Sequence, residues 1–126
     1  MKILITGASS GIGRDVAKVL AKKGNTIVLI ARDEKKLNDV KQDVEKKGAV
    51  AEIISMDLSN PQNCIDIHNR VKDVDILINN AGFGDCGNFT ETSLDKELKM
   101  INTNITAYHI LMKLYYQMQM MNIKPL

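Results

Sequence analysis

Short apolar runs and amphipathic segments alternate along the chain from its first residues onward. Four runs rich in Ile, Val and Leu predict buried strands at residues 2–6, 26–31, 50–55 and 74–79. Between these runs the apolar residues recur at helical spacing, and charged residues occupy most of the remaining positions. This regular alternation is typical of a parallel sheet with helices on its faces.

The three segments between the predicted strands carry clear helix signals. Gly24 is expected to end the first helix as its C′ residue, and Gly48 stands at the end of the second. Asn60 followed by Pro61 is a cap and a favoured first position for the third helix. The residues expected to face inward are Ile12, Val16, Ala17, Leu20 and Ala21 in the first helix, Leu37, Val40 and Val44 in the second, and Cys64, Ile65, His68 and Val71 in the third.

A longer helix is predicted over residues 93–120, beginning at the cap sequence Thr92-Ser93-Leu94-Asp95. It carries apolar residues on two sides, so more than one side requires cover. One stripe consists of Leu98, Ile101, Ile105, Tyr108, Met112 and Tyr115, and the other of Ala107, Leu111, Leu114 and Met118. The second stripe is covered either by another subunit or by further elements of the same fold.

Right-handed crossovers between these parallel strands predict the strand order 3-2-1-4. The whole chain, residues 1–126, fits one domain of a Rossmann-type three-layer α/β sandwich. In an open parallel sheet, ligands bind beyond the carboxyl ends of the strands, at the point where the strand order reverses. The crevice between the first and fourth strands is therefore the expected binding site.

The turn after the first strand has the composition of a phosphate-binding loop. Glycines at positions 7, 11 and 13 let backbone amides approach an anion closely. The helix that begins near Gly11 directs its unpaired N–H groups and its positive end toward the same point. The loop is therefore expected to bind the phosphates of a nucleotide.

Two charged residues follow the second and third strands at the same edge of the sheet. Arg32 can pair with a ribose 2′-phosphate, which favours NADP(H) over NAD(H). The alternative is a solvated arginine that pairs with Asp33 or Glu34. Asp57 can accept a hydrogen bond from the adenine amino group, or it is only a helix-start residue.

Composition and charge narrow the classes of function. The net charge is +2 and the lysines are mixed with acidic residues, which argues against a nucleic-acid partner. No apolar run is long enough to span a membrane, and the loop at Gly7 leaves no room before it for a signal peptide, so a cytoplasmic location is expected. Cys64, Cys86, His68 and His109 lack partners at ligand spacing, so no metal site is expected.

Several ordered motifs together resemble the short-chain dehydrogenase/reductase family. They are TGASSGIG at 6–13, AR at 31–32, DL at 57–58, NNAG at 79–82 and the asparagine of MINTNITA at Asn104. The resemblance implies a pyrophosphate and ribose site formed by Gly7, Ser9, Ser10, Gly11, Ile12 and Gly13. It also implies that Ser9 or Ser10 assists Arg32 at the 2′-phosphate.

The remaining motifs take their roles from the same resemblance. Asp57 and Leu58 would frame the adenine, and the segment Asn79, Asn80, Ala81 and Gly82 would support the sheet and line the nucleotide. Asn104 would be the active-site asparagine that holds a water in a proton relay. Taken from the residues alone, the segment at 79–82 is a turn after a strand, and Asn104 is a helix-bending or exposed polar residue.

Members of this family transfer a hydride between nicotinamide and a carbonyl or alcohol, using a tyrosine, a lysine four residues later and a serine. In this chain Tyr108, Tyr115 and Tyr116 are followed at that spacing by Met112, Gln119 and Met120, and no serine follows Ser93. The chain is therefore expected to be the cofactor-binding half of an NADP(H)-dependent oxidoreductase, truncated before the fifth strand and inactive by itself. The alternatives are a non-catalytic nucleotide-binding or regulatory module and an oligomerising structural subunit.

Truncation would also affect assembly. Without a fifth strand, the run 74–79 is an exposed apolar edge of the kind that pairs with another chain. A homodimer or larger homo-oligomer is therefore expected, through this edge or through the helix at 93–120. The other expected partners are a dinucleotide and, in a longer chain, a small carbonyl or alcohol substrate.

Overall fold

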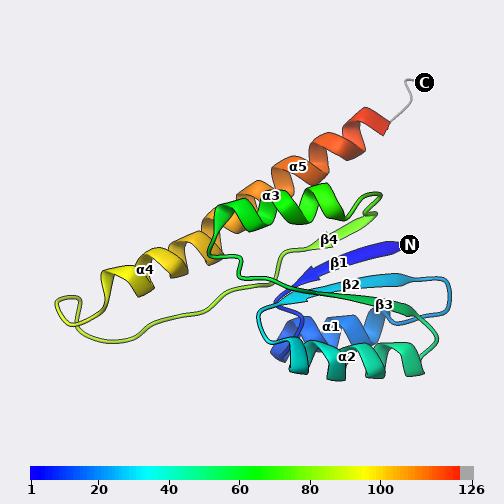
Figure 1. The fold of residues 1–126 in the computed structure, drawn as a ribbon, viewed down its shortest axis with the longest axis horizontal. Coiled ribbons are helices and arrows are strands. Elements are labelled where there is room, and N and C mark those ends of the chain that lie inside the picture. Colours follow the sequence, from blue (N-terminus) through cyan, green and yellow to red (C-terminus); the bar gives the residue numbers. More distant parts are fainter. Residues whose placement is uncertain (123–126) are drawn as a thin grey trace. The chain divides into compact units, whose positions relative to one another are not determined.

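The computed structural model describes residues 1–122, with side chains to residue 118. It divides into two compact units, which are taken in turn. The first unit comprises Met1–Asp57 and Asp73–Gly82, and the second comprises Leu58–Lys72 and the chain from Phe83 onward. The first unit contains the sheet, the glycine-rich loop and two helices (Figure 1).

The sheet of the first unit has four parallel strands in the order β3-β2-β1-β4. The strands are β1 (Lys2–Thr6), β2 (Thr26–Ala31), β3 (Val50–Ser55) and β4 (Ile76–Ile78). The predicted strand order is confirmed, and the first three strands have the predicted bounds. The order reverses between β1 and β4, so the switch point lies where it was expected.

The fourth strand is shorter than the predicted run 74–79, and side chains take part in the hydrogen bonding at both of its ends. At the start, the Lys2 amide donates to the carboxylate of Asp75 at 2.7 Å instead of to a backbone carbonyl. At the other end, the amide of Asn80 donates to the hydroxyl of Thr6 at 2.9 Å. The regular pairing with β1 is therefore confined to Ile76–Ile78.

Helices α1 (Gly11–Leu20) and α2 (Glu34–Lys46) pack on one face of the sheet (Figure 1). The predicted inner residues of α2 are confirmed, because Leu37, Val40 and Val44 are all buried. In α1 the prediction for Ile12 is wrong, since this residue in the first turn is 73% exposed. The buried residues of this core are Ile3, Ile5, Ala8, Ala17, Ala21, Ile27, Leu29, Leu37, Val40, Val44, Ala49 and Ala51.

Of the two glycines predicted at helix ends, Gly48 is confirmed and Gly24 is not. Helix α1 ends at Leu20, before the predicted C′ position at Gly24, because the side-chain amide of Asn25 donates to the Leu20 carbonyl at 2.9 Å. Gly24 instead lies in the turn that leads to β2. The second stop is confirmed, since Gly48 follows the C-cap Lys47 with a φ of +92°.

The second unit begins with α3 (Pro61–Arg70), whose predicted start is confirmed. The side chain of Asn60 accepts a hydrogen bond from the Gln62 amide at 3.0 Å, and Pro61 occupies the first turn. Ile67, rather than the predicted Ile65, is buried with Cys64, and Ile65 is 39% exposed. The inner face of α3 is thus rotated slightly from the predicted one, toward the side that packs on α5 (Ala107–Asn122).

The predicted helix at 93–120 is present in the structure but contains one irregular turn. It consists of α4 (Leu94–Ile101), a π-helical turn η1 (Asn102–Thr106) and α5, which continues to Asn122. The wider π turn inserts an extra residue into the helical repeat and so shifts which residues share a face. The predicted helix is therefore confirmed, with its start at the Ser93 cap, but its repeat is not a regular α-helix throughout.

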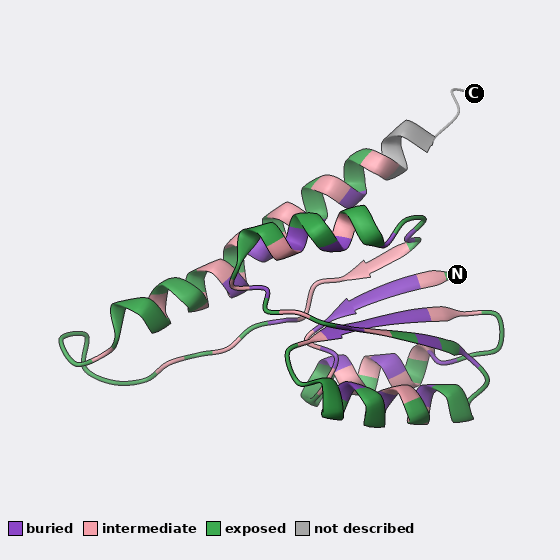
Figure 2. Ribbon diagram, in the orientation of Figure 1, coloured by how far each residue is buried: buried purple, intermediate pink, exposed green. Residues whose placement is uncertain are grey.

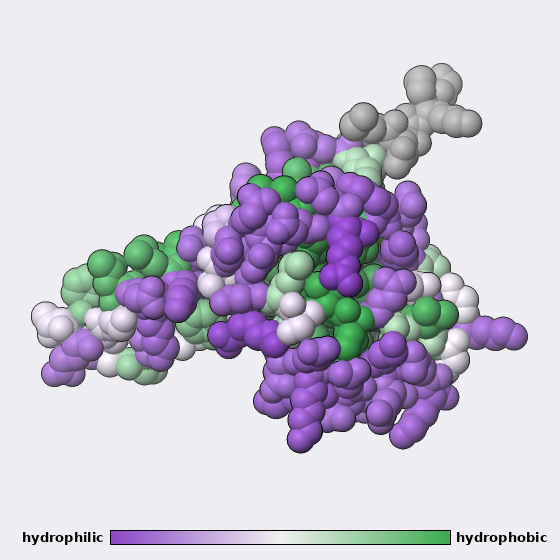
Figure 3. Space-filling view, in the orientation of Figure 1, coloured by the Kyte–Doolittle hydropathy of each residue, from purple (hydrophilic) through white to green (hydrophobic). Residues whose placement is uncertain are grey.

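The two apolar stripes of this region differ in burial, as Figure 2 shows along α4 and α5. Ala107 and Leu111 are buried, and Tyr115 is buried with them although it was assigned to the other stripe. Leu98, Ile101, Ile105 and Met112 remain exposed, and the apolar side chains of α4 are visible in Figure 3. Within the described residues, no helix is long and apolar enough to cross a membrane.

Candidate nucleotide-binding site

The glycine-rich loop connects the carboxyl end of β1 to the first turn of α1. Ser10 is the N-cap of α1 and has an extended backbone, but its side chain makes no capping hydrogen bond. The first N–H groups of a helix have no carbonyl partner within the helix. The amides at the start of α1 are therefore free of a side-chain cap and are available to an anion.

Two of the three glycines are required by close packing of the loop. A Cβ atom on Gly13 would collide with the carbonyl oxygen of Gly7. A Cβ atom on Gly7 would lie 2.8 Å from the Cα of Ala81. Gly11 differs, because its φ of +54° disfavours a side chain while open space surrounds it. The loop is thus pressed against the segment after β4 and is open in front of α1.

Thr6 fastens this loop to the segment that follows β4. Its hydroxyl oxygen accepts hydrogen bonds from the amides of Asn80 and Ala81, at 2.9 and 3.0 Å, and its proton is directed to the Ile78 carbonyl at 3.5 Å. The side-chain amide of Asn80 also donates to the Gly7 carbonyl, at 3.3 Å. The structure therefore brings the predicted residues Asn80 and Ala81 against the glycine-rich loop.

Thr6 itself was not among the predicted site residues. It is completely buried, and it is the last residue of β1, directly before the glycine-rich loop. Strands of this length are otherwise filled with apolar residues, so a polar residue at a strand end beside the switch point was the available signal.

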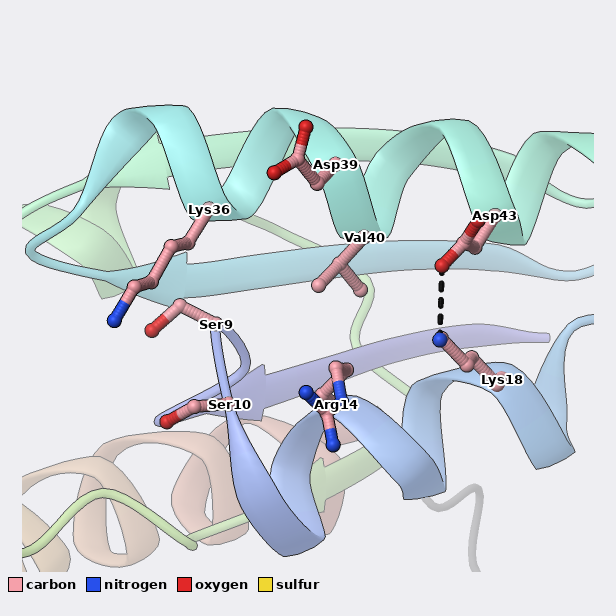
Figure 4. Close-up of a pocket in the computed structure, with 8 residues that line it drawn as sticks. All are labelled: Ser9, Ser10, Arg14, Lys18, Lys36, Asp39, Val40 and Asp43. Atoms are coloured by element: carbon pink, nitrogen blue, oxygen red, sulfur yellow. Dashed lines mark ion pairs between the residues drawn. The ribbon is translucent and has the colours of Figure 1, made fainter.

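A cavity of about 300 Å³ lies between α1 and α2, next to the loop (Figure 4). The predicted residues Ser9 and Ser10 contribute to its wall. Sequence reasoning missed the basic residues of the same wall, which are spread over two helices that lie far apart in the sequence. The lining residues are Ser9, Ser10, Arg14, Lys18, Lys36, Asp39, Val40 and Asp43.

Arg32 lies just beyond the carboxyl end of β2 and is exposed. It forms no ion pair with any described residue, so the alternative in which it pairs with Asp33 or Glu34 is not found. The carboxylate of Asp33 instead caps α2 by accepting from the Lys36 amide at 3.0 Å. The guanidinium of Arg32 thus remains available to a ligand at the edge of the sheet.

The two residues predicted to frame adenine fall in different units. Asp57 is exposed and follows β3 at the same edge of the sheet as the glycine-rich loop. Leu58 is 5% exposed and belongs to the core of the second unit. Asp57 therefore lies at the sheet edge, and Leu58 is packed in the second unit.

In the second unit, Asn104 lies in the π-helical turn and holds the backbone of Phe83 at two points. The Phe83 amide donates to the Asn104 Oδ1 at 3.0 Å, and the Asn104 Nδ2 donates to the Phe83 carbonyl at 2.8 Å. The side-chain amide is therefore engaged with the residue that directly follows the NNAG segment. This contact gives Asn104 a positioning role within the second unit.

The tyrosines of α5 do not have the environment of a general acid or base. Burial raises the pKa of Tyr108 and, more strongly, that of Tyr115. The hydroxyl of Tyr115 is also engaged, because it donates to the Val71 carbonyl at 3.0 Å. A catalytic phenol requires a pKa shifted toward neutrality by a nearby cation, and neither side chain meets this requirement.

A parallel sheet with a glycine-rich loop at its switch point is the architecture of Rossmann-type dinucleotide-binding proteins. The family profile described as short chain dehydrogenase matches residues 1–124. The chain therefore belongs to the short-chain dehydrogenase family, as its ordered motifs indicated. Proteins of this family are oxidoreductases.

Individual relatives agree with this assignment. An uncharacterized oxidoreductase of Staphylococcus epidermidis is 34% identical over 113 residues, which are 86% of this chain and 48% of the relative. Among solved structures, a short-chain dehydrogenase from Sphingobium yanoikuyae in complex with NADPH is 33% identical with a TM-score of 0.82, and the match covers 90% of this chain and 46% of that one.

A metagenomic short-chain oxidoreductase in complex with NADP is 29% identical, with a TM-score of 0.89 over 96% of this chain and 57% of that one. The chain thus spans about half the length of the relatives that it matches.

Proposed function

We propose that this chain is the NADP(H)-binding part of a short-chain oxidoreductase, in which a hydride passes between nicotinamide and a carbonyl or alcohol. The observation that carries the proposal is the first turn of α1, where the N–H groups have no side-chain cap, together with Arg32, which follows β2 at the same edge of the sheet and forms no ion pair with any described residue. Amides suit the pyrophosphate, and the guanidinium suits a ribose 2′-phosphate. The NADPH and NADP complexes of similar proteins support this choice of cofactor.

The residues of the first unit fit a dinucleotide by the chemistry of their donors. Gly11, Ile12 and Gly13 supply backbone amides at the helix start, and Ser9 and Ser10 supply hydroxyls. Asn80 and Ala81 form the wall beyond β4, and Asp57 is the acceptor proposed for the adenine amino group. Bound nicotinamide dinucleotide would supply the hydride donor or acceptor, while these residues bind and orient it.

We further propose that the chain of 126 residues does not turn over by itself. No tyrosine in it is followed four residues later by lysine, and burial raises the pKa of Tyr115 and that of the partly buried Tyr108. In a longer protein, a serine and a tyrosine–lysine pair from a downstream segment would complete the site. Asn104 would then position the loop at Phe83 next to them.

Calorimetric titration of the purified chain with NADPH and with NADH tests cofactor binding directly. Tighter binding of NADPH is the expected result, and absence of binding at millimolar concentrations of both dinucleotides would refute the proposal. A panel of aldehydes and ketones with NADPH tests the second point, where steady turnover by a chain of verified mass would contradict it.

A second candidate function is self-association through the second unit. Leu98, Ile101, Ile105 and Met112 are exposed along α4, η1 and α5, which is more apolar surface than a solvated helix needs. Light scattering at several protein concentrations, with and without NADPH, separates a structural subunit from a nucleotide-binding one. A stable oligomer whose molar mass is the same with and without NADPH would favour the structural role.

A further inference from the structure

The charges in the cavity between α1 and α2 are distributed unevenly. Lys18 forms an ion pair with Asp43 at 2.8 Å, and Arg14 forms one with Asp15 at 3.2 Å. Lys36 lines the same cavity, yet its ammonium group makes no ion pair within the part of the chain that the structure describes. One cation of the cavity wall is therefore left without an anion.

The unpaired lysine lies at the end of the cavity that meets the glycine-rich loop. Figure 4 shows the side chain of Lys36 extending from α2 toward Ser9, with Ser10 and the start of α1 beside it. Among the described residues, the hydroxyls of Ser9 and Ser10 have no hydrogen-bond partner, and Ser10 leaves the first turn of α1 uncapped. Cation, hydroxyls and helix N-terminus thus converge on one end of the cavity.

The remaining acidic residues of the wall do not neutralise this end. Asp43 is engaged by Lys18 at the other end of the cavity, and this contact lowers the pKa of its carboxyl group. Asp39 points away from Ser9 in Figure 4. The local charge around Ser9 and Lys36 is therefore positive and suits a small dianion.

We propose that Lys36 is a specificity-determining residue that binds, together with Ser9, the phosphate monoester on the ribose of NADP(H). The proposal rests on the proposed function and deepens it, because it adds a cation from α2 to Arg32 at the end of β2. Lys36 supplies a mobile point charge with three donors, and Ser9 supplies a hydroxyl donor. NADH lacks the phosphate monoester, so Lys36 would give it no comparable contact.

The test compares Lys36→Gln with Lys35→Gln in the 126-residue chain. Lys35 is the exposed neighbour on α2 and does not line the cavity, so the two variants share the same change of charge and differ in position. The cap of α2 uses the backbone amide of residue 36, so the substitution leaves it intact. Calorimetry gives Kd for NADPH, NADH, 2′,5′-ADP and 5′-AMP at low and moderate salt.

We expect Lys36→Gln to weaken NADPH and 2′,5′-ADP about tenfold, the usual effect of losing a charged hydrogen bond, while NADH and 5′-AMP bind as before. The loss should shrink at moderate salt. Lys35→Gln should change none of the four affinities appreciably. Equal losses for NADPH and NADH, or no loss for either, would overturn the inference while leaving the proposed function intact. If the unaltered chain binds neither dinucleotide, the proposed function fails and the inference fails with it.

Discussion

The hydroxyl of Thr6 accepts a hydrogen bond from the backbone amide of Asn80 at 2.9 Å, across the point where the strand order reverses. The same oxygen accepts from Ala81 at 3.0 Å, so one buried side chain satisfies two amides. Both amides follow the last residue of β4, beyond its regular pairing with β1. Thr6 thereby holds the two walls of the candidate nucleotide site together.

Replacing Thr6 with valine keeps the shape of the side chain and removes the acceptor. Two amides then lose their partner, and we expect a loss of about 2 to 4 kcal/mol in the free energy of unfolding. Urea unfolding followed by circular dichroism measures this change. Thr6→Ser retains the hydroxyl and should lose much less. A Thr6→Val variant as stable as the parent would show that the two hydrogen bonds contribute nothing.

Most of the core could be predicted because the spacing of apolar residues is a property of the local sequence. The strand order could be predicted because right-handed crossovers are a general rule of parallel sheets. Leu37, Val40 and Val44 recur at helical spacing and are buried as predicted. The end of α1 could not be predicted from Gly24, because the carbonyl of Leu20 is capped by the side chain of Asn25. A competing side-chain cap depends on the geometry of the turn, which no local pattern encodes.

Gly13→Ala should disrupt the loop, because the added methyl group collides with the Gly7 carbonyl. Overpacking of this kind costs about 1 to 3 kcal/mol, and displacement of the loop should also abolish dinucleotide binding. Thermal unfolding and calorimetric titration with NADPH measure the two effects. Gly84→Ala is the control, since no atom lies within 4 Å of its added methyl group. Unchanged NADPH affinity in Gly13→Ala would contradict the packing argument.

The part of the candidate site that is contiguous in the sequence could be predicted, as the core could, from the local sequence. Gly7, Gly11 and Gly13 lie in one contiguous motif, and the structure places them along the connection from the end of β1 to the first turn of α1. The cavity wall formed by Arg14 and Lys36 was missed because it joins two helices through the tertiary fold. Similarly, the π turn that holds Asn104 was predicted as ordinary helix, since a single inserted residue leaves the apolar spacing almost unchanged.

Asn104→Asp replaces the donor facing the Phe83 carbonyl with an oxygen while keeping an acceptor for the Phe83 amide. At neutral pH the carboxylate repels that carbonyl, so the variant should be less stable than the parent by about 1 to 3 kcal/mol. Below about pH 4 the carboxyl group is protonated and can donate again, so the difference from the parent should shrink. Paired unfolding curves at pH 7 and pH 4 measure it. A deficit that stays constant with pH would exclude the role assigned to Nδ2.

His68 should make the second unit sensitive to mild acid. Its ring packs edge-on against Tyr115 with centroids 5.0 Å apart, its Nε2 atom is buried without a partner, and burial followed by repulsion from Lys72 lowers its pKa. The unfolded chain, with a pKa near 6.5, then binds the proton more readily, so stability is full above about pH 6.5 and falls as the pH decreases through it. His68→Phe keeps a ring against Tyr115 and should flatten the decrease in melting temperature between pH 7 and pH 5. His109→Phe, a change at an exposed position of α5, should leave the decrease in place. If both variants follow the parent curve, the acid sensitivity has another origin.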